Sequence, residues 1–179
     1  MKKECKFTRF IRNNFLAMVI VGISIISFVL VYLLSGISGS SGEEKYYIDT
    51  LEIVFGNATM QVSKQEQTKI VALEGGMSIF GLCSIIALIL ADILAIVSIF
   101  VRNYALDYYA VVAIIVSGVL MLLLFNMGTM VTIEGNVMQF KHFVLRNSFK
   151  LGAGAIAYGI TTIVGGAIGL FIEEKNLVR

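Results

Sequence analysis

A single carboxylate lies inside a long apolar run of the sequence. Asp92 occurs in the segment IALILADILAIV, residues 86–97, in which every other residue is apolar. A charge at mid-depth of a bilayer is costly, and such residues commonly face a polar layer, a water-filled path or a partner group. The chemistry that this residue could perform is the binding of a proton or a small cation within a membrane.

Hydroxyl side chains recur at a similar depth in the other apolar segments. Asp92 lies ten residues before Arg102, roughly 15 Å from that end at the rise of an α-helix. Counting inward by the same distance finds Ser24, Ser27, Ser117, Thr161 and Thr162.

Three interpretations of this layer are open. A protonated Asp92 could join the hydroxyls in a structural layer that fixes the helix register. It could instead be a proton or cation site of a transporter or channel, or contact a polar residue of another membrane subunit. A single acid without a partner acid, a histidine or a broken helix favours the structural interpretation.

Small residues form a regular pattern in the last apolar segment. They recur at alternating spacings of three and four, which places them on one face of a helix: Gly152, Ala155, Gly159, Thr162, Gly166 and Gly169. Such a face lets another helix backbone approach closely. The pattern predicts a helix-packing face, used either within the chain or toward a second copy or another membrane protein.

Other site chemistry is sparse. His142 is the only histidine, and the two cysteines, Cys5 and Cys83, form no CxxC motif. Without a catalytic triad, a phosphate-binding glycine loop or a metal-ligand spacing, we expect no enzymatic activity, no cofactor and no metal site. Asn57 begins an Asn-Ala-Thr sequon, and whether it is glycosylated stays open.

The composition places the chain in a membrane. It is 58% hydrophobic and 15% charged, and its mean hydropathy is +0.88. Four stretches reach the roughly 20 apolar residues that a membrane helix needs, namely 15–37, 76–101, 105–127 and 151–172. We predict an all-α membrane protein with a four-transmembrane-helix bundle.

Basic residues set the expected orientation. Residues 1–14 hold five Lys or Arg against one Glu, a net charge of +4, so this segment should stay in the cytoplasm beside anionic lipid headgroups, without any need for nucleic acid. The turn 102–104 and the tail 173–179 are then also cytoplasmic, in the cell membrane. The basic residues of 141–150 argue in the opposite direction.

Two loops should lie outside. Loop 38–75 is expected to begin with a Gly/Ser linker, to continue with a β-hairpin of 50–55 and 58–63 across Gly56 and Asn57, and to end with a helical lead-in over 63–74. Loop 128–150 repeats the pattern with strands 130–134 and 137–143 around a second Gly-Asn pair. The four strands are predicted to form one small sheet, a β-rich cap.

This layout resembles that of claudin-like tetraspan proteins, which have a larger, strand-bearing first outside loop and a tight cytoplasmic turn. The resemblance covers the arrangement alone, because the chain has no Trp and no loop Cys. It implies a fold and no function. We therefore expect a non-enzymatic structural or accessory membrane protein that acts through helix packing and loop contacts. The alternative is a small proton- or ion-coupled transporter or channel that uses Asp92.

Overall fold

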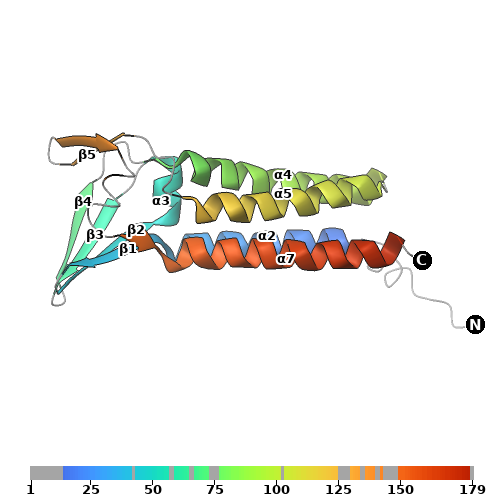
Figure 1. Cartoon of the computed structure of the whole chain (residues 1–179), viewed down its shortest axis with the longest axis horizontal. Coiled ribbons are helices and arrows are strands. Elements are labelled where there is room, and N and C mark those ends of the chain that lie inside the picture. Colours follow the sequence, from blue (N-terminus) through green and yellow to red (C-terminus); the bar gives the residue numbers. More distant parts are fainter. Residues whose placement is uncertain are drawn as a thin grey trace, which may run out of the picture.

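The chain forms a bundle of long helices with a sheet at one end (Figure 1). The computed structural model describes residues 14–41, 43–56, 59–64, 67–72, 77–101, 103–124, 130–133, 136–139, 142 and 149–177. We call the end of the bundle that carries the sheet the cap end.

Within the described residues, four helices are long and apolar enough to cross a membrane, which agrees with the predicted number. They are α2 (Phe15–Leu33), α4 (Ile79–Val101), α5 (Tyr104–Leu122) and α7 (Ala153–Leu177). Their outward faces are apolar too, as in Ile25, Ile89 and Ile160, each more than half exposed. A helix that is hydrophobic all round is typical of a membrane span.

The helices surround one another in the order α4, α5, α7, α2. The pairs α4–α5 and α5–α7 pack most closely, α2 packs mainly on α7, and the seam between α2 and α4 is looser. The interior is filled by aliphatic and small side chains such as Ile20, Leu88, Ala95 and Ile114. Because these residues lie on one stripe of each helix, the bundle has a continuous packed core.

A five-stranded antiparallel sheet covers the cap end. Its strands run in the spatial order β4 (Gln67–Ala72), β3 (Thr59–Lys64), β2 (Glu44–Asp49), β1 (Ser35–Ser41) and β7 (Lys150–Leu151). Strand β7 precedes α7 directly and pairs with β1. The sheet therefore ties the two halves of the chain together above the helices.

The sheet has two different faces, as the alternation of side chains along a strand requires. On β2, Ile48 is buried and Tyr46 is half-buried against the ring of Phe149, with ring centroids 5.7 Å apart. Lys45 and Tyr47, which alternate with them, are exposed. On β2, the apolar face thus packs toward the rest of the protein, and the polar face is exposed.

The segment 50–55, predicted as a strand, is instead the short helix α3 (Thr50–Phe55). Its buried residues are Thr50, Ile53 and Val54, which have helical spacing. Gly56 ends the helix with a φ of 81°, the left-handed conformation that glycine adopts without strain. Gly56, read from the sequence as part of a hairpin turn, is therefore a helix cap here.

The first loop contains more strand than predicted. Helix α2 ends at Leu33, and the predicted span end and Gly/Ser linker form β1, in which Gly39 leaves room for the Phe149 ring. The predicted helical lead-in over 63–74 is also wrong, because β3 and β4 pair from Thr59 opposite Ala72 to Lys64 opposite Gln67.

The second loop does contain a hairpin, β5 (Met130–Ile133) with β6 (Asn136–Gln139). It forms a two-stranded sheet of its own and does not join the larger one. The expectation of one four-stranded sheet is therefore wrong: among the described residues, the larger sheet takes β1 to β4 from the first loop region and β7 from the second.

Candidate functional site in the helix bundle

A cluster of three buried hydroxyls joins α4, α5 and α7. Ser84 donates a hydrogen bond to the Ser117 carbonyl at 2.7 Å, and Ser117 donates to the Ser84 carbonyl at 2.8 Å. The Tyr158 hydroxyl contacts both serine hydroxyls and lies 3.4 Å from that of Ser84. All three side chains are fully buried, so the cluster locks the rotation of three helices relative to one another.

Tyr158 is the member that the sequence interpretation missed. It directly precedes Gly159 of the small-residue face and is the largest fully buried side chain of the described residues. A tyrosine amid the small residues of an apolar span was the available signal, since a buried Tyr hydroxyl usually has a hydrogen-bond partner.

The threonines of the predicted layer do not reach Asp92. Thr162 is buried, and its hydroxyl donates to carbonyls of its own helix, those of Tyr158 at 2.9 Å and Gly159 at 3.1 Å. Such back-bonding satisfies the hydroxyl locally. Thr161 is only half-buried.

Asp92 belongs to a different group, on the α2–α4 seam. It is half-buried, and its carboxylate lies next to the hydroxyl of Ser24 on α2. Ser24 is 3% exposed and Ser27, one turn along the same buried stripe, is 0% exposed. We call Asp92, Ser24 and Ser27 the seam group.

Three oxygens of the seam group are buried and make no hydrogen bond of good geometry within the described ranges, although the Ser24 hydroxyl lies beside the Asp92 carboxylate. They are Asp92 Oδ1, Ser24 Oγ and Ser27 Oγ, and no other buried side-chain oxygen or nitrogen of these ranges shares that condition. For example, Thr50 donates to the Leu34 carbonyl at 3.1 Å and Ser98 to the Ala95 carbonyl at 2.8 Å.

The predicted hydroxyl layer is therefore split into two levels. Ser84, at the level of Ser117, and Asp92 lie on the same helix but roughly 12 Å apart along it. Counting residues from the span ends estimates depth to within a turn or two. It cannot tell which neighbouring helix a side chain faces.

The small-residue face of α7 packs within the chain. A Cβ at Gly159 would lie 2.6 Å from Leu122 Cγ, and one at Gly169 would lie 3.0 Å from Val111 Cγ2, both on α5. Gly166 abuts Ile115 of α5, and Gly152 abuts the backbone of Ser35 at the start of β1. With Ala155 and Thr162 also fully buried, this face is occupied by neighbours from the same chain.

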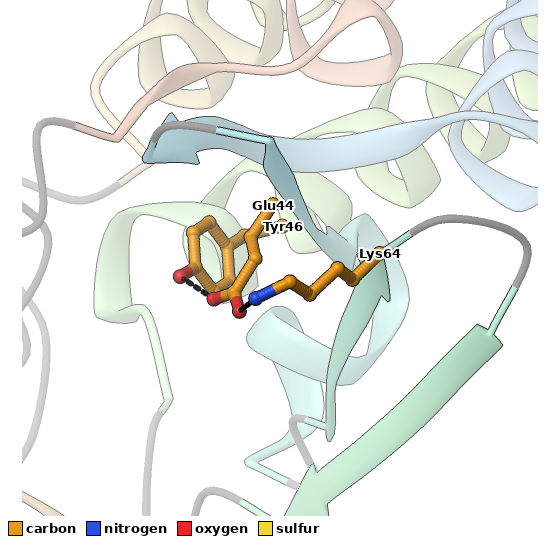
Figure 2. Close-up of polar contacts among 3 residues, drawn as sticks. All are labelled: Glu44, Tyr46 and Lys64. Atoms are coloured by element: carbon orange, nitrogen blue, oxygen red, sulfur yellow. Dashed lines mark hydrogen bonds and ion pairs between the residues drawn. The ribbon is translucent and has the colours of Figure 1, made fainter.

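The cap carries its own polar cluster, which ties β2 to β3 (Figure 2). Glu44 accepts a hydrogen bond from the Tyr46 hydroxyl at 2.7 Å and an ion-pair contact from Lys64 at 3.1 Å. The Tyr46 bond, with Lys64 second, lowers the pKa of Glu44, and the same bond raises the pKa of Tyr46. Glu52 of α3 holds β3 as well, by accepting from the Thr59 amide at 2.8 Å.

The described residues contain no group of three His, Cys, Asp or Glu side chains that could hold a metal ion. His142 is exposed, and Cys83 is an exposed free thiol on α4. Cys5 and Asn57, which were singled out in the sequence, lie outside the described residues.

Comparison with protein families, with curated proteins and with solved structures finds no match for this chain. The likeness to claudin-like proteins therefore rests on the arrangement of helices and strands alone.

Proposed function

We propose that this protein is a non-enzymatic, structural or accessory membrane protein. The bundle acts as a rigid anchor, and the cap makes the contacts with other proteins. The function lies in association and includes no chemical step.

The observation that carries this proposal is the contrast between the two ends of the molecule. Inside the bundle, hydrogen bonds within the cluster satisfy the hydroxyls of Ser84, Ser117 and Tyr158. Small residues on α7 let this helix pack closely against α5. At the cap, the polar face of β2 exposes Lys45, Tyr47 and Asp49. Tyrosine is enriched at protein–protein interfaces relative to the rest of the surface, so the exposed Tyr47 supports a contact role for this face.

The proposed orientation places the cap outside the cell membrane. The basic segment 1–14 then lies on the cytoplasmic side, where anionic lipid headgroups attract it. Because α4 and α5 are joined by a short connection at the end of the bundle opposite the cap, that connection is cytoplasmic in the same orientation.

Co-purification tests the proposal. The tagged full chain, extracted from its native membrane in mild detergent, should retain a discrete partner protein or a second copy of itself. A Lys45→Ser, Tyr47→Ser double variant should lose that partner. Val164→Ala, a change at a half-exposed position on α7, should keep it. Retention of the partner by the cap variant at the wild-type level would contradict the role of the cap.

A second candidate function, ion- or proton-coupled transport through Asp92, is favoured by the unpaired oxygens of the seam group. Purified protein in sealed vesicles would then catalyse cation flux, and Asp92→Asn would abolish it. Flux that is indistinguishable from that of empty vesicles excludes this candidate.

A further inference from the structure

We propose that the seam group, Asp92 with Ser24 and Ser27, binds a sodium ion between α2 and α4. The inference goes beyond the proposed function and does not depend on the contacts of the cap. It assigns a ligand to the part of the bundle whose polar atoms are left unpaired.

The first argument is the location of the unpaired atoms. All three belong to two facing helices, and Ser24 Oγ lies beside the Asp92 carboxylate. Elsewhere in the described core, hydroxyls such as those of Ser84, Ser98 and Thr162 have partners. Buried polar groups are normally hydrogen-bonded, so each of these atoms requires an explanation, and a bound ion is one that would satisfy all three.

The second argument concerns charge. The helices α2, α4 and α5 contain no Lys, Arg or His, and neither does α7 before its last turns, so no described side chain within the spans can balance an ionised Asp92. Water could bridge the hydroxyls but would leave that charge uncompensated. A single carboxylate is balanced by a single positive charge, which favours a monovalent ion.

The third argument concerns the ligand atoms. Hydroxyl and carboxylate oxygens are the donors that hard cations prefer. Asp92 Oδ1 and both serine hydroxyls are buried inside the bundle, so a ligand that contacts all three must be small. A small ion needs only the space between the two helices, whose seam is the looser one.

Direct binding of ²²Na⁺ to the purified full chain at neutral pH tests the site. Wild-type protein should bind the isotope saturably, and unlabelled NaCl should displace it far better than KCl. Asp92→Asn, which keeps the size of the side chain, should abolish binding. Ser24→Ala should raise the half-saturating sodium concentration about tenfold, a typical result of losing one polar contact to a charged group.

Matched variants separate the site from general stability. Ser98→Ala changes a buried serine of α4 that lies outside both the seam group and the Ser84 cluster, and it should leave sodium binding unchanged. Folding of every variant is verified by circular dichroism and by a single cooperative thermal transition. The absence of saturable binding to folded wild-type protein overturns the proposal. So does binding that survives in Asp92→Asn, or displacement by KCl as effective as by NaCl.

Discussion

Tyr158 connects three helices at a single residue, since its hydroxyl contacts Ser117 of α5 and Ser84 of α4 from its place on α7. Its ring is fully buried among the helices. We regard it as the residue on which the rotational register of the bundle depends most directly.

Tyr158→Phe should destabilise the protein modestly. The change removes the hydroxyl and keeps the ring, and interhelical hydrogen bonds in membrane proteins average about 0.6 kcal/mol with a maximum near 1.7 kcal/mol. Thermal unfolding in detergent should therefore show a lowered midpoint. Thr162→Val is the matched control on the same helix: its hydroxyl bonds only to its own backbone, so its loss should cost almost nothing. A larger loss in Thr162→Val than in Tyr158→Phe would contradict this assignment.

At the residue scale, the sequence identifies rare side chains better than common ones. Asp92 is conspicuous because a carboxylate is so costly in an apolar run. Ser117 lies at the level of Ser84, roughly 12 Å from that of Asp92, and helix rotation directs Thr162 to carbonyls of its own helix. Only the packing of the helices supplies that rotation, and one sequence does not contain it.

Among the elements, the long helices are the most predictable. The length of each apolar segment is enough to indicate a membrane span, and no short sequence signal inside the segment predicts a different structure. The segment 50–55 shows the opposite case, because Leu51, Ile53 and Phe55 suggest alternation while Thr50, Ile53 and Val54 suggest a helix turn. The segment adopts the helical period, which buries Thr50, Ile53 and Val54 against neighbouring elements, and not the alternating period of a strand.

The strands of the first loop depend on tertiary pairing. The small residues of β1 suggest a flexible linker from sequence. In the structure, Gly36 lets Thr50 approach the strand closely, and Gly39 does the same for the Phe149 ring. The polar segment after β3 suggests a helix by composition, and it becomes β4 because pairing with β3 extends the sheet. Local propensity has little influence where such pairing is available.

Adding bulk to the α5-facing side of α7 should be destabilising. Gly159→Leu places a side chain where even a Cβ would lie 2.6 Å from Leu122 Cγ and 3.2 Å from the Gly118 carbonyl oxygen. Overpacking of this kind costs about 1–3 kcal/mol or more, so assembly of the bundle should fail or its thermal midpoint should fall sharply. Ile160→Leu introduces the same side chain at the neighbouring position, which is 54% exposed, and should be neutral. Equal stability of the two variants would show that α7 does not pack on α5 as described.

The molecule as a whole divides its surface by chemistry. Apolar side chains cover the outside of the bundle, while Lys45, Glu44 and Lys64 concentrate charge at the cap. This division suits a body that is held in lipid with its cap in water.

Thiol labelling tests the proposed orientation. Ser40 is exposed on β1, so Ser40→Cys should react with a membrane-impermeant maleimide in intact cells. Cys5 should react only after the membrane is opened, because the basic N-terminal segment is expected in the cytoplasm. A Cys83→Ser background removes the other thiol. Labelling of Cys5 in intact cells would reverse the orientation.

The central claim is that the cap, and not the opposite end of the bundle, meets other proteins. Two exposed tyrosines give a matched pair for its test: Tyr47 on the cap strand β2, and Tyr108 near the opposite end, on α5. Each is replaced singly by the photoreactive benzoylphenylalanine, and native membranes are irradiated. We predict that the probe at position 47 yields a discrete protein adduct and that the probe at position 108 yields none. Adducts from position 108 with none from position 47 would contradict the claim.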